Sequence, residues 1–128
     1  MALKRGFKQL MAEANAVVET ITVQQAMHLM DDPATVFVDI RDKLEVERSG
    51  MIKGAVHAPR GHLEFHAEPE SPIHVPALSS GKRIVLYCAS GGRSTLAAKT
   101  LIDMGVPNVC HVAGGFNAWA QANGPVQR

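Results

Sequence analysis

The chain has few cysteines, few aromatic residues and no excess of charge of either sign. Its 128 residues include two cysteines, and 5% of them are Phe, Trp or Tyr. Two cysteines do not make a disulfide framework, so a reducing compartment is the default and we expect a cytoplasmic protein. The formal net charge is +1. Since charge drives much of nucleic-acid binding, no nucleic-acid partner is expected.

Long hydrophobic runs are also missing. No apolar stretch approaches the roughly 20 residues that a membrane-spanning helix requires. The basic N-terminus at Lys4, Arg5 and Lys8 is not followed by the apolar core of a signal peptide, because Lys8, Gln9 and Glu13 interrupt it. We therefore expect no membrane partner. The length and the 46% of hydrophobic residues fit one domain with a core of ordinary size.

Residues 3–18 carry apolar side chains at helical spacing. These side chains are Leu3, Phe7, Leu10, Met11, Ala14, Val17 and Val18. The pattern predicts an amphipathic helix packed on the domain, with a partner or dimer surface as the alternative. The chain is accordingly divided into this N-terminal helix, residues 1–19, and a domain over residues 20–128.

Short apolar runs alternate with helical segments through the rest of the chain. The expected strands are Ile21 and residues 36–40, 56–57, 84–87 and 109–112, and the expected helices cover residues 23–30, 42–48, 61–66, 93–104 and 116–122. Residues 68–81 include three prolines and predict a long surface loop. Strands that alternate with helices in this way predict an α/β fold in three layers, α/β/α, with a central, mainly parallel five-stranded sheet.

Cys88 is the strongest candidate for a functional residue. It follows the apolar run 84–87 and opens the loop Cys88-Ala89-Ser90-Gly91-Gly92-Arg93-Ser94, which leads into an expected helix. Open parallel sheets place their chemistry at the carboxyl ends of strands. Loop N–H groups and a helix N-terminus favour anions there, and the same field lowers the pKa of a thiol. The alternative is a small buried hydrophobic side chain.

The residue types around Cys88 favour the functional interpretation. Gly91 and Gly92 let the backbone curl without Cβ clashes. Arg93 offers a planar set of donors suited to an oxyanion, and Ser94 caps the next helix or hydrogen-bonds the thiolate. The two small residues after the cysteine keep the loop open. The loop is therefore predicted to hold a reactive cysteine among anion-binding groups.

Four segments together resemble the rhodanese family of sulfurtransferases in its single-domain form. They are Val38-Asp39-Ile40-Arg41, Ile52-Lys53-Gly54-Ala55-Val56-His57-Ala58-Pro59, the loop from Tyr87 to Ser94, and Val112-Ala113-Gly114-Gly115-Phe116-Asn117-Ala118-Trp119. One of these motifs alone is weak, but four in the family's order are specific. The resemblance implies the rhodanese-like fold and an enzyme without a cofactor. In this enzyme Cys88 takes a sulfane sulfur from thiosulfate or a persulfide donor, and a thiophilic acceptor, cyanide or a thiol, then removes it.

The resemblance also implies roles for the residues around Cys88. Asp39 and Arg41 would brace the loop, and Arg93 would orient it and help to bind an anionic donor. The family often has an arginine where this chain has Ala89, which weakens the expected binding of thiosulfate. Arg60 is a candidate replacement for that cation, or else a solvated surface residue. The residues expected to bind substrate are Ala89, Ser90, Gly91, Gly92, Arg93 and Ser94.

Other functions stay open beside this enzyme. One is a sulfur-carrier or regulatory module that passes the persulfide to an acceptor protein. Another is a non-catalytic interaction domain, although such family members commonly lack the cysteine. Cysteine phosphatases have five residues between cysteine and arginine, whereas four separate Cys88 from Arg93. Phosphatase chemistry is therefore a distant third.

Two further sets of residues, a group of histidines and the second cysteine, are candidates for a role. His62 and His66 are four apart, with His57 and His74 nearby, but they do not match a metalloprotease or zinc pattern, so no metal is expected. They are interpreted as a polar segment that could border the Cys88 pocket. Cys110 is predicted to lie inside a buried strand, with a resolving thiol for Cys88 as the alternative.

Overall fold

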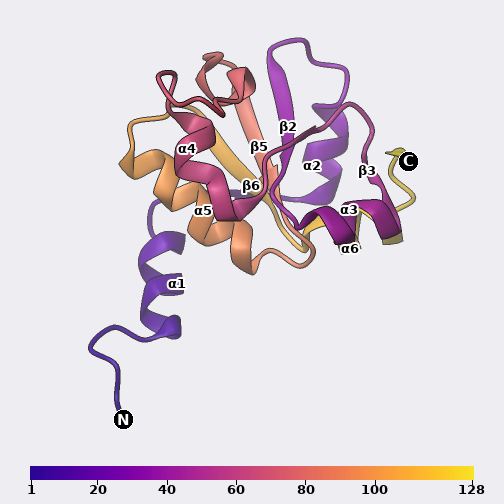
Figure 1. The fold of residues 1–128 in the computed structure, drawn as a ribbon. Helices are drawn as coiled ribbons and strands as arrows, with labels where there is room; N and C mark the ends of the chain where they lie inside the picture. Colours follow the sequence, from indigo (N-terminus) through magenta and orange to yellow (C-terminus); the bar gives the residue numbers. More distant parts are fainter.

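The centre of the fold is a sheet of parallel strands with helices on both faces (Figure 1). The computed structural model describes residues 1–128. Across the sheet the strand order is β1-β6-β5-β2-β4, and every neighbouring pair is parallel. This confirms the expected α/β class and the five-stranded sheet, which is parallel throughout. The strands are β1 (Glu19–Ile21), β2 (Thr35–Asp39), β4 (Val56–His57), β5 (Arg83–Tyr87) and β6 (Val109–Val112).

The helices form where the sequence predicts them, with bounds that differ by a few residues. Thr22 starts the first of them with a capping box, because its side chain accepts from the Gln25 amide and the Gln25 side chain accepts from the Thr22 amide. A short turn, η2 (Pro76–Ser79), interrupts the expected loop over residues 68–81. The helices after the N-terminal one are α2 (Val23–His28), α3 (Lys43–Ser49), α4 (Leu63–Ala67), α5 (Gly92–Asp103) and α6 (Gly115–Gln121), and η1 (Arg60–His62) precedes α4.

Side chains of β5 alternate between two layers of the core. Ile84 and Leu86 pack in one hydrophobic cluster with α4 and α5, whereas Val85 and Tyr87 pack in the other with α2 and α6. Successive strand residues point to opposite faces of a sheet, which explains the split. Cys88 continues this alternation and belongs to the cluster on the α5 side.

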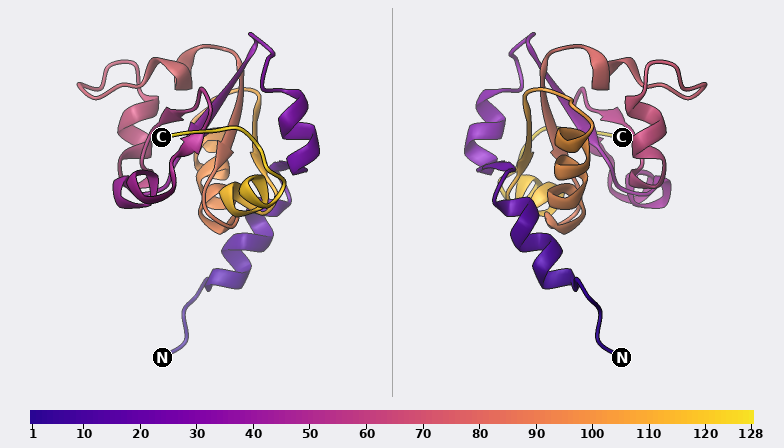
Figure 2. Two further views of the ribbon diagram at one scale, coloured as in Figure 1. Left: turned by 90° about the vertical axis from the view of Figure 1, so that its right-hand side faces the viewer. Right: turned by 90° about the vertical axis from the view of Figure 1, so that its left-hand side faces the viewer.

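The N-terminal helix is shorter than the sequence predicts. It runs over α1 (Phe7–Asn15) instead of residues 3–18. The helix packs against α5 and buries Ala14, while Leu3 and Phe7 are 64% and 67% exposed. Figure 2 shows the first residues pointing away from the rest of the chain. Residues 3–5 are exposed, so the amphipathic pattern gains no burial there and the helix does not extend over them.

Two short strands were not predicted from the sequence. β3 (Met51–Ile52) pairs with β7 (Val126–Gln127) in an antiparallel ladder separate from the main sheet. Each strand has two residues, too few for a hydrophobic period to show. The pairing ties the C-terminal segment to the chain beyond α3. None of the helices combines the length and the apolar character needed to cross a membrane.

Candidate active site

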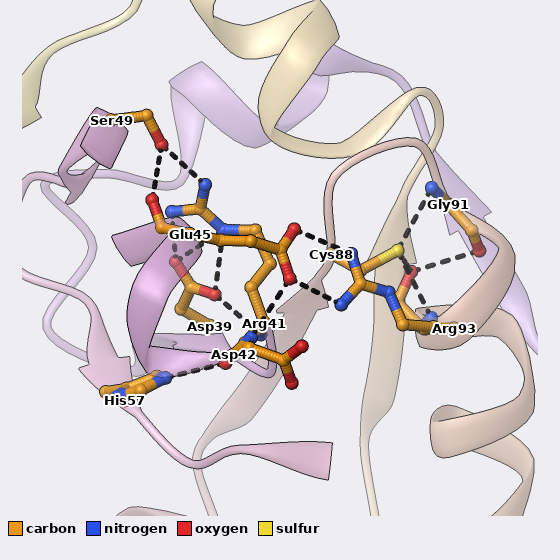
Figure 3. Close-up of polar contacts among 10 residues, drawn as sticks. Asp39, Arg41, Asp42, Glu45, Ser49, His57, Cys88, Gly91 and Arg93 are labelled. Atoms are coloured by element: carbon orange, nitrogen blue, oxygen red, sulfur yellow. Dashed lines mark hydrogen bonds and ion pairs between the residues drawn. The ribbon is translucent and has the colours of Figure 1, made fainter. Parts of the chain in front are cut away.

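The sulfur of Cys88 lies inside a turn of hydrogen-bond donors (Figure 3). Cys88 follows β5 directly and is 1% exposed. The amide of Gly91 donates to Sγ at 3.1 Å, and the amide of Ser94 donates to it at 3.4 Å. The hydroxyl oxygen of Ser94 lies 3.5 Å from the same sulfur. Donors that converge in this way favour a negatively charged sulfur.

Gly91 makes the tight turn of this loop possible. Its φ angle is 113°, a backbone conformation that residues with a Cβ rarely adopt. α5 begins directly after it, so the Ser94 amide belongs to the first helical turn. The free N–H groups at a helix N-terminus carry partial positive charge. The sulfur therefore lies at the N-terminus of α5, whose partial positive charge also favours an anion.

The local structure lowers the pKa of the Cys88 thiol. Burial alone would raise this pKa, but the hydrogen bonds from the Ser94 hydroxyl and from the amides of Ser94, Gly91 and Ser90 together outweigh burial. A lower pKa increases the thiolate fraction at neutral pH, and the thiolate is the nucleophilic form. The loop therefore favours the thiolate form of Cys88.

We expect alkylation of Cys88 by iodoacetamide to have a pH midpoint below about 8.5, the value for a free thiol. Cys110 should react only after unfolding, because burial raises the pKa of its thiol to about 11. Labelling over a pH series, followed by digestion and mass spectrometry of the two cysteine peptides, measures both. The Cys110→Ser variant is the control. A Cys88 midpoint at or above the free value would contradict an anion-stabilising loop.

The start of α6 holds the Cys88 loop from the other side. The amide of Phe116 donates to the Cys88 carbonyl at 2.8 Å, and the amide of Asn117 donates to the Ala89 carbonyl at 3.0 Å. A Cβ at Gly115 would overlap the Cys88 carbonyl oxygen. This close approach explains Gly115, whereas at Gly114, where φ is 74°, a Cβ would overlap the side chain of Ala118. The motif before Trp119 thus positions the loop that carries Cys88.

Arg93 faces a carboxylate instead of open solvent (Figure 3). Its Nη1 and Nη2 donate to the two carboxylate oxygens of Glu45 at 2.7 and 2.9 Å. Hydrogen bonds from Arg93 hold the pKa of Glu45 at about 2, and Glu45 in turn raises the pKa of Arg93. The expected cation is present at the loop, but its charge is matched by Glu45.

Sequence reasoning missed Glu45, although a signal for it exists. Asp42 precedes α3, and its amide donates to the Glu45 side chain at 3.1 Å. An Asp followed three residues later by Glu is typical of a helix start. Such a start after β2, the strand next to β5, places Glu45 at the edge of the sheet where Cys88 lies.

Asp39 and Arg41 form a buried ion pair at the end of β2. Asp39 is 0% and Arg41 2% exposed, and Nη2 of Arg41 lies 2.7 Å from Oδ2 of Asp39. Arg41 also donates to the Ser49 hydroxyl at 2.8 Å and to the Gly50 carbonyl at 2.6 Å. Its guanidinium carbon lies 4.1 Å from the ring centroid of Phe116. Arg41 therefore links β2, the end of α3 and α6, and it approaches the Cys88 loop through the rings of Phe116 and of Tyr87, whose centroid lies 5.9 Å from its guanidinium carbon.

The structure does not bring Arg60 to the Cys88 loop. Its guanidinium pairs with Glu64 at 3.2 Å and lies 3.5 Å from the Thr100 hydroxyl. The rings of His62 and His66 are 5.8 Å apart, and no three His, Cys, Asp or Glu side chains gather as a metal would require. The other two histidines have protein partners: His57 contacts the Arg41 carbonyl and His74 contacts the Ser79 hydroxyl.

A histidine that the sequence analysis did not consider lies close to the loop. His111 of β6 is 4% exposed, and its Nδ1 is 2.8 Å from the Ser94 hydroxyl oxygen. Burial lowers the pKa of its imidazole, which favours the neutral form. Ser94 thus connects the sulfur of Cys88 to a buried neutral histidine.

Cys110 lies on the opposite face of the sheet from Cys88. It is 0% exposed and packs in the cluster with Val85 and Trp119, whereas Cys88 packs with Leu86. The placement agrees with a thiol inside a buried strand. A resolving role would require Cys110 to reach Cys88 through the sheet. The structure offers no such route without unfolding of β6.

Comparison with known proteins agrees with this architecture. Residues 22–122 match the rhodanese-like domain. A protein of unknown function from Rhodopseudomonas palustris, described as a possible tyrosine phosphatase, has a TM-score of 0.93 and 45% identity over 99% of this chain and 98% of its own. The polysulfide-sulfur transferase homodimer of Wolinella succinogenes has a TM-score of 0.72 and 26% identity, covering 94% and 86% of the two chains.

A curated relative adds a third kind of protein. The tRNA uridine(34) hydroxylase of Yersinia enterocolitica is 31% identical over 101 residues, which cover 79% of this chain and 28% of that protein.

The fold and the site define the class of the protein: an α/β domain with a cysteine held among hydrogen-bond donors at the carboxyl edge of a parallel sheet. Within that class the chain belongs to the rhodanese-like domain family, whose match covers the sheet, the Cys88 loop and α6.

Proposed function

We propose that the protein is a sulfurtransferase that carries a sulfane sulfur on Cys88. The observation that supports this most directly is the convergence of the Gly91 and Ser94 amides on the cysteine sulfur. These donors stabilise a thiolate before the reaction and again when the thiolate is the leaving group. Membership of the rhodanese-like family and the likeness to a polysulfide-sulfur transferase support the same chemistry.

The proposed reaction has two displacement steps at sulfur. The Cys88 thiolate attacks the outer sulfur of the donor, the donor's S–S bond breaks, and the donor remainder leaves with the electron pair as sulfite or a thiolate. The enzyme then holds a Cys88 persulfide. A cyanide or thiolate acceptor attacks the outer sulfur, and the electron pair of the second S–S bond returns to Cys88. The product is thiocyanate or a new persulfide, and no oxidant or cofactor is consumed.

The charge at the rim of the loop, formed by Ala89 and Arg93, favours one class of sulfur donor over another. Thiosulfate carries two negative charges, and its binding benefits from an unmatched cation. Glu45 matches the charge of Arg93, and Ala89 supplies none. An organic persulfide carries one negative charge, and a polysulfide spreads its two charges over the ends of a sulfur chain, so the end that reaches the loop needs less positive charge than the compact thiosulfate dianion. We therefore propose donors of the persulfide and polysulfide class ahead of thiosulfate.

The acceptor is either a small thiol or a cysteine of another protein. None of the four surface hollows of the structure is lined by residues 88–94. The sulfur does not lie at the floor of a hollow, and because Cys88 is 1% exposed an acceptor has to approach it across the loop. Such access suits a protein thiol as well as a small one, so a sulfur-carrier role remains the alternative within the same chemistry.

Intact mass spectrometry tests the proposed function. The reduced protein is incubated separately with inorganic polysulfide and with thiosulfate. We expect it to gain the mass of one sulfur atom from polysulfide, and less completely from thiosulfate, with the added atom mapped to Cys88 and removed by dithiothreitol or cyanide. The Cys110→Ser variant should gain the same mass. No gain from either donor would contradict sulfur transfer.

Phosphatase chemistry is less well supported by the loop. Four residues separate Cys88 from Arg93, and Arg93 points to Glu45 instead of the sulfur. A phosphoryl group needs donors to its oxygens around the cysteine, and the arginine here is already engaged. The likeness to a possible tyrosine phosphatase therefore does not outweigh the sulfur chemistry.

A further inference from the structure

A chain of polar side chains runs from the buried Cys88 to an exposed threonine at the edge of the sheet. The Ser94 hydroxyl oxygen lies 3.5 Å from the sulfur of Cys88 and 2.8 Å from Nδ1 of His111. On the other side of the ring, Nε2 of His111 lies 2.9 Å from the hydroxyl oxygen of Thr20. Thr20 and His111 are paired residues of β1 and β6. Three groups from three elements thus connect in series behind the cysteine.

The partners of His111 decide which ring nitrogen carries the proton. Burial favours the neutral imidazole, which has one N–H donor and one acceptor nitrogen. The Ser94 hydroxyl donates to the Gly91 carbonyl at 3.2 Å, so its oxygen accepts from Nδ1–H, and Nε2 is left to accept from the Thr20 hydroxyl at 2.9 Å. Nδ1 then carries the proton and donates to the Ser94 oxygen. The hydroxyl proton of Ser94 is left free to point away from His111.

Two acceptors compete for the Ser94 hydroxyl proton. One is the Gly91 carbonyl oxygen at 3.2 Å, and the other is the sulfur of Cys88 at 3.5 Å. The Gly91 carbonyl already accepts from the Thr95 hydroxyl at 2.8 Å. When Cys88 is ionised, its negative charge makes the sulfur the stronger acceptor. Each hydrogen from Thr20 to Ser94 then points toward the thiolate.

We propose that His111 is a positioning residue for Cys88, because its Nδ1–H fixes the Ser94 hydroxyl as a donor to the thiolate. The arrangement of these hydrogen bonds does not depend on sulfur transfer, but its benefit to catalysis rests on the proposed function. The thiolate is the nucleophile of the first step and the leaving group of the second, when the S–S bond breaks and the electron pair returns to Cys88. A donor fixed on that sulfur favours both steps.

No unpaired charged group lies among the contacts of His111, so nearby charges do not account for the stabilisation of the thiolate. The hydrogen-bond partners of His111 are the hydroxyls of α5 and β1, and its facing residue on β5 is Leu86. The charged groups on the packed elements are already paired: Arg93 with Glu45, Asp39 with Arg41, and Arg83 with Glu19 beside Cys110.

The test is the pKa of the Cys88 thiol, measured by the pH dependence of iodoacetamide labelling without any sulfur donor. We expect His111→Leu to raise the midpoint by about one unit, a roughly tenfold loss of thiolate at neutral pH. In His111→Asn the amide N–H takes the place of Nδ1–H, so the midpoint should return most of the way to its original value. An unchanged midpoint in His111→Leu would overturn the proposal.

A double-mutant comparison tests whether His111 acts through Ser94. If it does, His111→Leu shifts the Cys88 midpoint no further in a Ser94→Ala background than Ser94→Ala does alone. A full additional shift in that background would overturn the proposed route. Sulfur transfer by His111→Leu should fall about tenfold at neutral pH and recover as pH rises through the new midpoint. A purely structural loss would not recover with pH.

Thr20→Val provides an independent variant if His111→Leu does not fold. It removes the donor to Nε2 at an exposed edge strand, and its β-branched side chain suits that strand. The Cys88 midpoint should rise by less than in His111→Leu. A lowered or unchanged midpoint in Thr20→Val would contradict the assigned direction of the hydrogen bonds. Because labelling needs no sulfur donor, these outcomes are separate from failure of the mass-gain test of sulfur transfer.

Discussion

Replacing Cys88 by serine should abolish sulfur transfer while the fold remains. A hydroxyl is far less readily ionised than a thiol and does not form a persulfide. The serine oxygen keeps the amide donors of Gly91 and Ser94 within reach, so the loop keeps its partners. Thiocyanate formation from polysulfide and cyanide should fall to the rate of the protein-free mixture. Circular dichroism and a thermal melt establish that the variant is folded.

The matched control for this prediction is Cys110→Ser. Cys110 lies in the hydrophobic cluster on the other face of the sheet. Its substitution should lower thermal stability, because a polar hydroxyl replaces a thiol that is 0% exposed and packs in a hydrophobic cluster, and should leave turnover of the folded protein near the original value. Turnover near normal in Cys88→Ser would remove Cys88 from the mechanism. Loss of turnover in folded Cys110→Ser would restore the resolving-thiol alternative.

The strand, loop and helix around Cys88 were predictable because the sequence signals for them are local. An apolar run, a cysteine, two glycines and a helical pattern follow one another within residues 84–104, and the structure places β5, the loop and α5 there. The parallel sheet followed from the alternation of strands and helices. The N-terminal helix was placed correctly but predicted too long, since periodicity alone does not reveal that Leu3 has no surface to contact.

The partners of the loop residues were not predictable, because they depend on contacts between distant parts of the chain. His111 contacts Thr20, which is 91 positions away in the sequence. In the sequence alone it is one polar residue within an expected apolar strand. Glu45 is 48 positions from Arg93. The sequence therefore indicated a cation for the donor, whereas the structure shows an ion pair. Strand order and register, which bring these groups together, are fixed only by the packed sheet.

Arg93 and its spacing from Cys88 lead to the second large effect. Insertion of one glycine between Gly92 and Arg93 should lower sulfur transfer by about a hundredfold or more. The extra residue shifts the first turn of α5, moves the Ser94 amide away from the sulfur and breaks the ion pair with Glu45. Misplacement of catalytic groups by about 1 Å is enough for a loss of this order.

The control for the insertion is a glycine added after Gly81. Gly81 lies in an exposed turn before β5, with open space around it. An insertion there lengthens a surface connection and should leave sulfur transfer near its original rate. Comparison of the two insertions separates a general effect of a longer chain from a change in the catalytic loop.

Both reactions should be assayed in the folded insertion variants. The glycine before Arg93 creates the five-residue spacing of the cysteine phosphatases, so hydrolysis of an aryl phosphate should rise to a trace at most. A larger gain is not expected, since no general acid is positioned to protonate a leaving group. Unchanged sulfur transfer would show that loop length does not select the chemistry. The case against a phosphatase would then depend on the Arg93–Glu45 pair, which neutralises the one cation that a phosphoryl group would need.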